Sequence, residues 1–317
     1  MLKMIRPYLE IIKIKTIPNN NNLINLKIRL TKFCNWDCSY CIQGHNKPKK
    51  PSDESIKESI DFLIQELKDK KLDEKDIELG IIGGEVSLFN IKDLILSPLI
   101  KSNIKIKKIN IISNLSRDIN WYKDLITYSK ANNIKYFLRF SFHEDFITKE
   151  TFLKKVKELI DFDGDNKKFT LEAVVNNNNF NIIKSFFNLK KKMFKEDVKL
   201  NLDADTVNIN LNQEILSFIE EVDKNDKIKK NFEVYFRGNK LHPLLFNRND
   251  IVDLYPLKRF PSKGFLCKEK LLSLIYDVPL KKLTGACNIN AEDEYICDKD
   301  YCRLCHKYVN LSKKYVN

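Results

Sequence analysis

Apolar residues in the first 226 positions recur with two alternating periods, one of two residues and one of three to four. The shorter period predicts strands, whose successive side chains point to opposite faces, and the longer period predicts helices that bury one face. The predicted strands are 23–30, 77–83, 106–113, 134–143, 168–176 and 198–205. The predicted helices are 55–71, 91–101, 118–132, 149–160, 180–193 and 214–224, the first with Ser52 or Asp53 as its N-cap.

Six strands that alternate with six helices predict an α/β fold with a parallel sheet and right-handed crossovers. This alternation suits a doubly wound sheet or part of a TIM-type barrel. Beyond position 226 the rhythm changes, and a β-hairpin is expected at 232–246 around Gly238–Asn239. We therefore expect two domains, 1–226 and 227–317.

The composition is that of a folded protein without membrane segments. Hydrophobic residues make up 43% of the chain, but no stretch approaches the roughly 18 consecutive apolar residues of a membrane helix. Residues 1–20 lack the apolar run and cleavage site of a signal peptide, so we expect a cytoplasmic protein. The net charge of +13 comes mainly from lysine, with only eight arginines. Because phosphate recognition favours arginine forks, nucleic acid is not the expected partner, although an acidic partner stays open.

The eight cysteines fall into two groups. Three lie within 34–41, none between that segment and Cys267, and five lie within 267–305. A disulfide framework would need an oxidising compartment, which nothing in the sequence supports. Two separate metal or cluster sites are therefore expected.

The first group, Cys34, Cys38 and Cys41, follows the first predicted strand in one short loop. Three thiolates can bind three irons of a cubane and leave the fourth iron open to another ligand. Zinc would need a fourth ligand, for which His45 is the nearby candidate. The second predicted strand ends in Gly83–Gly84–Glu85, where paired glycines allow a close approach of the backbone to a ligand.

These residues resemble the radical S-adenosylmethionine (SAM) superfamily. The spacing of the three cysteines, with Tyr40 before the last, is similar to its signature loop, and Gly83–Gly84–Glu85 is similar to its GGE motif, with Val86 where many members have Pro or Thr. Weaker matches follow in the same order. They are Ser113–Asn114, with Leu115 in place of a glycine, then Ser141, which shares a strand face with Arg139 and His143, and Asn176.

The resemblance implies a partial (β/α)6 TIM-type barrel with its ligands at the carboxyl ends of the strands. It implies that SAM chelates the unique iron of a [4Fe–4S] cluster and is cleaved reductively to a 5′-deoxyadenosyl radical that takes a hydrogen atom from the substrate. The electron would come from a donor such as flavodoxin or ferredoxin. The residues implied to contact SAM are Tyr40, Gly83, Gly84, Glu85, Ser113, Asn114, Ser141 and Asn176.

The tail resembles the SPASM or twitch extensions of this superfamily, a small cysteine-rich α+β domain. That resemblance implies one auxiliary [4Fe–4S] cluster, with a hairpin formed by 271–275 and 281–283 but without the usual Asp-Gly turn. A structural zinc site stays an alternative, and the role of Cys297 stays open. The implied ligands are Cys267, Cys287, Cys302 and Cys305.

The function expected from this resemblance is radical chemistry on a peptide or protein side chain. Asp203 and Asp205, at the end of the sixth predicted strand, are candidates to deprotonate a substrate radical. Three alternatives remain: the same chemistry on a sugar, nucleoside or alcohol, an RNA-modifying enzyme, and a non-catalytic iron–sulfur or zinc protein.

Overall fold

The computed structural model divides the chain into two compact units, which are described separately. The larger comprises Asn25–Lys224 and Ile275–Leu283, and the smaller comprises Met1–Ile24, Asn225–Leu274 and Thr284–Asn317. The described residues are 11–16, 23–41, 48–194, 198–204, 214–215, 217–218, 222, 232–236, 260–261, 265–267, 273–285, 295–296, 301–302 and 311–313.

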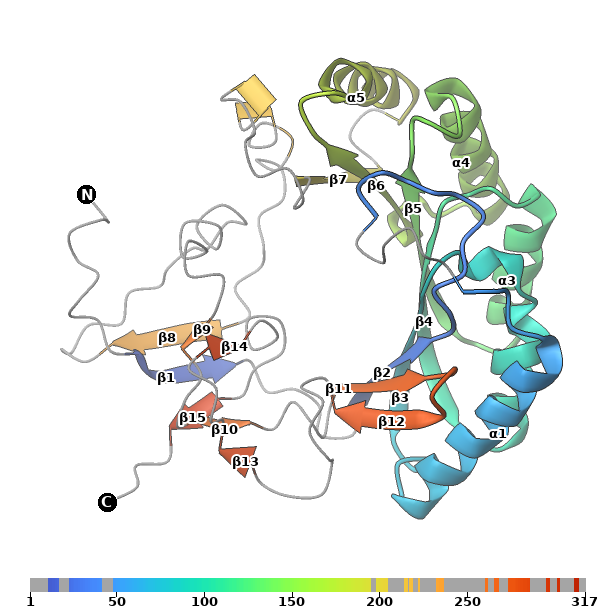
Figure 1. Ribbon diagram of the computed structural model, residues 1–317, viewed down its shortest axis with the longest axis vertical. Coiled ribbons are helices and arrows are strands. Elements are labelled where there is room, and N and C mark those ends of the chain that lie inside the picture. Colours follow the sequence, from blue (N-terminus) through green and yellow to red (C-terminus); the bar gives the residue numbers. More distant parts are fainter. Residues whose placement is uncertain are drawn as a thin grey trace. The chain divides into compact units, whose positions relative to one another are not determined.

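The larger unit contains a mostly parallel sheet of eight strands in the order β12-β11-β2-β3-β4-β5-β6-β7 (Figure 1). The pairs from β3 through β7 are parallel. The six predicted strands are confirmed as β2 (Leu23–Arg29), β3 (Asp76–Ile82), β4 (Lys105–Ser113), β5 (Lys135–Phe142), β6 (Phe169–Val175) and β7 (Lys199–Ala204).

Helices follow these strands as the period of the sequence predicts. Ser52 is the N-cap of the first helix, where its hydroxyl oxygen accepts a hydrogen bond from the Ser55 amide at 3.2 Å. Four of the predicted helices are confirmed in full. Of the helix predicted at 214–224, the structure describes five residues, and all of them are helical: Glu214–Ile215, Ser217–Phe218 and Val222. The four are α1 (Asp53–Asp69), α3 (Ile119–Ala131), α4 (Lys149–Asp163) and α5 (Phe180–Phe194).

The helix predicted near 91–101 is irregular. A π-helical turn, η3 (Lys92–Leu96), precedes α2 (Ser97–Lys101), and the Ser97 amide donates to the Lys92 carbonyl five residues earlier. Pro98 follows at once and has no amide hydrogen for the regular helical bond, which fits a change of pattern at this point. Short 3-10 turns, η2 (Val86–Leu88) and η4 (Asn166–Lys168), complete the unit.

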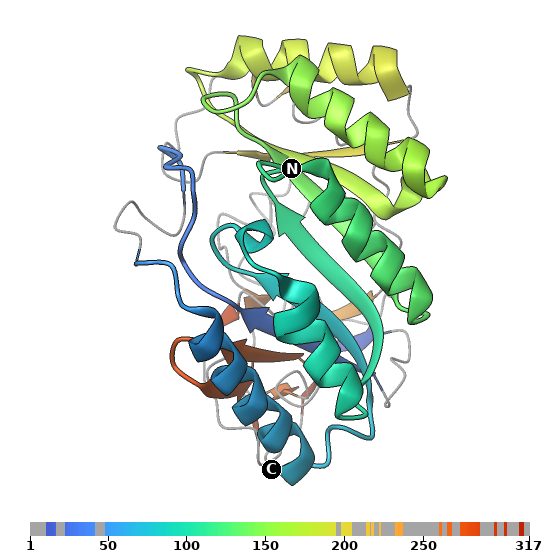
Figure 2. The same cartoon turned by 90° about the vertical axis from the view of Figure 1, so that its right-hand side faces the viewer.

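The described helices cover one face of the sheet. Figure 2 shows α1, α3, α4 and α5 in front of the strands, and Figure 1 shows them on the same side. Along β5 and β6 every second residue is buried against them, while the alternate residues are half-buried. A doubly wound sheet would carry helices on both faces, so this arrangement is the one expected of a barrel-type α/β fold. No helix in the described part of the chain is long and apolar enough to cross a membrane.

A hairpin from the far end of the sequence completes the edge of this sheet. The predicted hairpin is confirmed as β11 (Ser273–Asp277) and β12 (Lys282–Gly285), with its first strand two residues later than expected. The buried Tyr276 hydroxyl donates to the Ser59 carbonyl of α1 at 2.6 Å, and the Val278 amide donates to the Arg29 carbonyl of β2 at 3.0 Å. Arg29 also forms a 3.0 Å ion pair with Asp277, so the ends of β2 and β11 lie side by side.

The smaller unit contains a five-stranded sheet in the order β13-β10-β15-β1-β8 and a two-stranded sheet of β14 and β9. Of the hairpin predicted at 232–246, the structure describes only the first strand, β8, and this strand pairs with β1. Residues 237–246 lie outside the described residues. The strands are β1 (Ile11–Thr16), β8 (Phe232–Phe236), β9 (Phe260–Pro261), β10 (Phe265–Cys267), β13 (Tyr295–Ile296), β14 (Tyr301–Cys302) and β15 (Leu311–Lys313).

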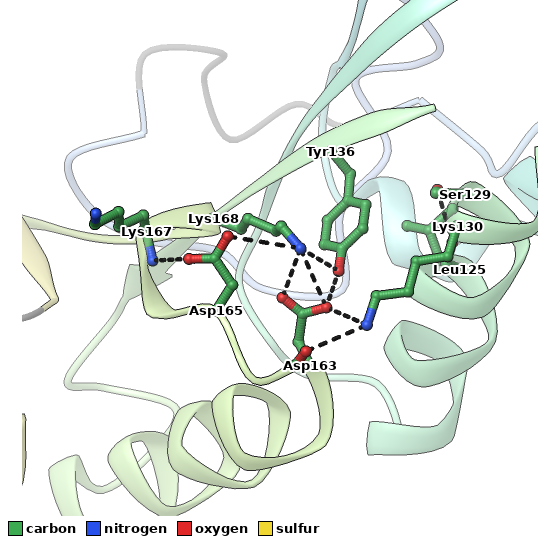
Figure 3. Close-up of polar contacts among 8 residues, drawn as sticks. All are labelled: Leu125, Ser129, Lys130, Tyr136, Asp163, Asp165, Lys167 and Lys168. Atoms are coloured by element: carbon green, nitrogen blue, oxygen red, sulfur yellow. Dashed lines mark hydrogen bonds and ion pairs between the residues drawn. The ribbon is translucent and has the colours of Figure 1, made fainter. Parts of the chain in front are cut away.

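A buried carboxylate ties three elements together near the start of β5 (Figure 3). The Asp163 side chain is 0% exposed and ends α4, where its oxygens lie 2.6 Å from Lys130 Nζ and 3.1 Å from Lys168 Nζ and accept from the Tyr136 hydroxyl. Burial alone would raise the pKa of Asp163, but Lys130, Tyr136 and Lys168 more than offset it, so that pKa lies below its usual value.

This network predicts a pH-dependent loss of stability in an Asp163→Asn variant. At neutral pH the variant should unfold about 1–2 kcal/mol more easily, because the two lysines lose a charged acceptor but both stay partly exposed to water. Since the folded pKa of Asp163 is depressed, its contribution is complete above the unfolded pKa of about 4 and is lost as the pH falls below it. Thermal unfolding at pH 7 and pH 3 should therefore show a gap between wild type and variant that narrows in acid. Asp165→Asn, at a more exposed carboxylate of the same network, serves as the control and should unfold close to wild type at both pH values. If the stability difference between wild type and Asp163→Asn were equal at pH 7 and pH 3, this account would be contradicted.

Candidate active site

The residues singled out from the sequence lie at one edge of the larger unit. The cysteine loop follows β2, Gly83 follows β3, Ser113 ends β4, His143 follows β5 and Asn176 follows β6. Because these strands are parallel, their carboxyl ends meet at the same edge of the sheet, where α/β folds place their ligand sites.

The backbone at the glycine pair holds the start of the cysteine loop by hydrogen bonds. The Gly84 amide donates to the Thr31 carbonyl at 2.7 Å, and the Glu85 amide donates to the Phe33 carbonyl at 2.9 Å. A Cβ atom on Gly84 would lie 1.8 Å from the Phe33 oxygen, and Gly83 has a φ of +149°, which side chains rarely adopt. The close approach expected toward a ligand is made here to the backbone that leads into Cys34.

Glu85 is buried, with 1% of its surface exposed, and joins the ends of two strands. Its Oε1 accepts from the Ser87 amide at 2.9 Å and from the Ser113 hydroxyl at 2.7 Å, and its Oε2 accepts from the Asn114 amide at 2.6 Å. Burial raises the pKa of Glu85 although these donors act in the opposite direction. Three of about four acceptor positions of the carboxylate are thus used within the protein.

Asn114 reaches from the end of β4 to the cysteine loop. Its Nδ2 donates to Asn35 Oδ1 at 3.1 Å and lies 3.9 Å from Cys34 Sγ. Leu115, which stands where the resemblance has glycine, adopts a φ of +60° and is fully buried. This left-handed position explains why glycine suits it, and the buried leucine side chain offsets part of the backbone cost.

The three cysteines of the loop are described as thiols outside any disulfide between described residues. Cys38 is buried, while Cys34 and Cys41 are half-buried, and the Trp36 amide donates to Cys34 Sγ at 3.5 Å. Across the described ranges no three His, Cys, Asp or Glu side chains converge as ligands of one ion. A cubane requires something different, because each cysteine binds a separate iron. Three thiols on one loop, with N–H donors aimed at sulfur, suit that donor set.

Aromatic side chains pack against this loop. The buried Tyr40 ring stacks on His143 with centroids 5.8 Å apart, and its hydroxyl lies 3.0 Å from His143 Nδ1. Trp36 stacks on Phe146 at 5.1 Å and meets His143 edge-on at 5.5 Å. Burial and the neighbouring Glu144 carboxylate raise the pKa of Tyr40, so its phenol stays neutral. Sequence reasoning missed Trp36 and Phe146, although Trp36 stands between two of the cysteines.

Asn176 shapes the turn into α5. Its Oδ1 accepts from the amides of Asn178 and Asn179 at 2.9 and 3.0 Å, while Asn179 Oδ1 accepts from the Asn176 amide at 2.8 Å. Asn179 Nδ2 continues to Glu144 Oε1 at 2.6 Å. The described contacts of Asn176 are thus those of a turn residue. Asn179 and Glu144 belong to the same hydrogen-bond network, and they were not identified from the sequence.

Arg139 and Ser141 lie on the sheet face that the helices leave uncovered. Arg139 forms an ion pair with Glu172 of β6, and Ser141 is opposite Glu172 in the register of the two strands. Lys108 and Glu78 form a second ion pair on this face at 3.3 Å. This half-buried face therefore carries two ion pairs below the strand ends.

The remaining predicted site residues belong to other parts of the chain. Asp203 lies in β7 opposite Val174, with only its backbone described. Cys267 lies in β10 and Cys302 in β14, two different sheets of the smaller unit. Those outside the described residues are His45, Asp205, Cys287, Cys297 and Cys305.

No protein-family model matches the sequence, and no curated protein matches it. Among solved structures, SuiB of Streptococcus suis bound to the precursor peptide SuiA has 12% identity and a TM-score of 0.44 over 87% of this chain and 63% of that chain. SuiB bound to S-adenosylmethionine has 12% identity and a TM-score of 0.42 over 80% and 58% of the two chains.

Coproporphyrinogen III oxidase (HemN) from Escherichia coli, described as a radical SAM enzyme, has 12% identity and a TM-score of 0.39 over 80% of this chain and 62% of that chain. The chain thus spans about three fifths of the length of these proteins.

The burial of Glu85 predicts that it stabilises the fold in the absence of any cofactor. Glu85→Gln should lower stability by about 2 kcal/mol, because the amide nitrogen of glutamine would meet a donor that needs an acceptor. Thermal unfolding of the cofactor-free protein measures this cost. Glu78→Gln, a half-buried carboxylate of β3, is the matched control and should cost less than half as much. Equal unfolding of Glu85→Gln and wild type would contradict the role assigned to the carboxylate.

Proposed function

We propose that this chain is a radical SAM enzyme with a partial (β/α)6 barrel and a [4Fe–4S] cluster on Cys34, Cys38 and Cys41. The observation that carries the proposal is the loop itself. Three thiols follow β2, and hydrogen bonds to the ends of β3 and β4 fix the backbone and side chains that lead into them. A loop this firmly held at the ligand edge of a parallel sheet suits a bound group better than a surface turn.

The residues around the loop have distinct tasks in this proposal. The cluster, when bound, supplies the electron that cleaves SAM to a 5′-deoxyadenosyl radical. The neutral Tyr40 ring would pack near the adenine. The carbonyl groups of Gly83–Gly84 would accept from the SAM ammonium, while the amides of Gly84 and Glu85 hold the cysteine loop. Glu85 has one acceptor position left for that ammonium after its three hydrogen bonds within the protein. Ser113 and Asn114 orient this carboxylate, and Ser141 and Asn176 complete the rim.

The substrate that we propose is a peptide or protein side chain. This class rests on the resemblance of the cysteine-rich tail to SPASM and twitch extensions, in which Cys267, Cys287, Cys302 and Cys305 would hold an auxiliary [4Fe–4S] cluster. Asp203 or Asp205 would remove a proton from the substrate radical. An external electron donor of the flavodoxin or ferredoxin class would reduce the first cluster.

The central claim predicts the loss of SAM cleavage when the first cysteine group is removed. The triple variant Cys34→Ala, Cys38→Ala, Cys41→Ala should form no 5′-deoxyadenosine after anaerobic reconstitution with iron and sulfide and reduction by dithionite. Chromatography of the nucleoside product measures this directly. Ser39→Ala, an exposed position in the same loop, should still cleave SAM. Formation of 5′-deoxyadenosine by the triple variant, or its absence with wild type, would contradict the proposal.

The auxiliary cluster predicts a defined iron content. Wild type should bind about eight irons after reconstitution, four for each cubane. Cys302→Ala with Cys305→Ala should bind about four and still cleave SAM in the absence of substrate. Metal analysis separates this outcome from the zinc alternative, in which wild type binds about four irons and one zinc that survives exposure to oxygen.

A further inference from the structure

His143 lies directly against one of the three cysteines. Its Nδ1 is 3.2 Å from Cys38 Sγ, although the two residues are 105 positions apart in the sequence. Cys38 is the buried cysteine of the loop, so its sulfur has little access to water. A hydrogen bond from a side chain therefore matters more to this sulfur than it would to an exposed one.

The imidazole is held in this orientation from two sides. Tyr40 stacks on one face of the ring with an interplanar angle of 9°, and Trp36 meets the ring edge-on at 75°. His143 comes directly after β5, whose backbone is paired on both sides. A ring fixed by stacking and by a sheet keeps its nitrogen in place without help from the ligand.

The protonation of Nδ1 follows from the chemistry of its neighbours. A thiolate bound to iron has no hydrogen to give and can only accept. Nδ1 must then carry the hydrogen to make a favourable contact with Cys38. The Tyr40 hydroxyl lies 3.0 Å from the same nitrogen, and its oxygen can accept a hydrogen bond, so this contact is also compatible with a hydrogen on Nδ1.

We propose that His143 donates an N–H···S hydrogen bond to the Cys38 thiolate and thereby makes the iron–sulfur cluster easier to reduce. The inference rests on the proposed function, because it requires a cluster on Cys38. Reduction adds one electron from the external donor, and part of the added negative charge resides on the sulfurs. A donor at sulfur stabilises the reduced state more than the oxidised state. His143 is thus a positioning residue that acts through Cys38.

Asn114 supplies a second contact of the same kind. Its Nδ2 lies 3.9 Å from Cys34 Sγ, and the Trp36 amide lies 3.5 Å from that sulfur. Two of the three cysteines therefore receive N–H groups from outside their own side chains. The His143 contact is the shorter side-chain contact and the one that a substitution can remove without changing the backbone.

The test compares His143→Phe with His143→Asn. Phenylalanine keeps an aromatic ring beside Tyr40 but offers no donor, whereas the amide nitrogen of asparagine occupies nearly the position of Nδ1. Each protein is reconstituted, its iron is counted, and its midpoint potential is measured by a redox titration followed by electron paramagnetic resonance. We expect a more negative potential for the Phe variant, with about a tenfold lower ratio of reduced to oxidised cluster at the wild-type midpoint, equal to 59 mV for one electron. The Asn variant should return most of the way to wild type.

The outcomes separate this inference from the proposed function. A wild-type protein that takes up no iron would overturn both. Wild type and both variants with the same iron content and the same potential would overturn the role of His143 alone. A shift shared by the Phe and Asn variants would also overturn it, because the donor at the Nδ1 position would then make no difference. A Phe variant that fails to bind iron, beside an Asn variant with the wild-type potential, would support a donor that the cluster needs even to assemble.

Discussion

The contact between the backbone before Cys34 and the glycine pair after β3 is the constraint on which the site depends. Two hydrogen bonds, from Gly84 to Thr31 and from Glu85 to Phe33, extend the pairing of β2 and β3 past the ends of both strands. A side chain at Gly84 would collide with the Phe33 carbonyl oxygen, so the loop could not lie there. The same two residues place Glu85, which in turn holds Ser113 and Asn114.

A buried carboxylate at this point organises the edge of the sheet. Glu85 gathers two backbone amides and a hydroxyl from the ends of two neighbouring strands. A carboxylate removed from water needs several hydrogen-bond donors. The bonds to Glu85 therefore hold the two amides and the hydroxyl group in place. Asn114 passes that order on to Asn35 in the cysteine loop. The loop is thus held by its backbone from one side and by a side chain from the other.

The sequence predicted the elements well and the contacts between them poorly. Strand bounds such as those of β4 and the N-cap Ser52 follow from local periodicity and local hydrogen bonding, which a short window contains. The partner of Gly84 and the contact of His143 with Cys38 join residues far apart in the chain, and no local pattern specifies them. Pro98 was visible in the sequence, but its position alone does not specify the π turn that precedes it. The predicted cysteine loop is described through Cys41, whereas the tail cysteines are described only as backbone or lie beyond the described residues.

The docking of the β11–β12 hairpin has a consequence for how the chain is made. Tyr276 bonds to Ser59 across 217 residues, and its strand covers the side of β2 that does not pair with β3. During translation β2 leaves the ribosome long before β11 is synthesised. Until β11 pairs with it, this edge of β2 has unpaired amide and carbonyl groups that a strand of another chain could bind. The larger unit therefore completes its sheet late, and a nascent chain stalled before residue 275 would expose the very edge that leads into the cysteine loop.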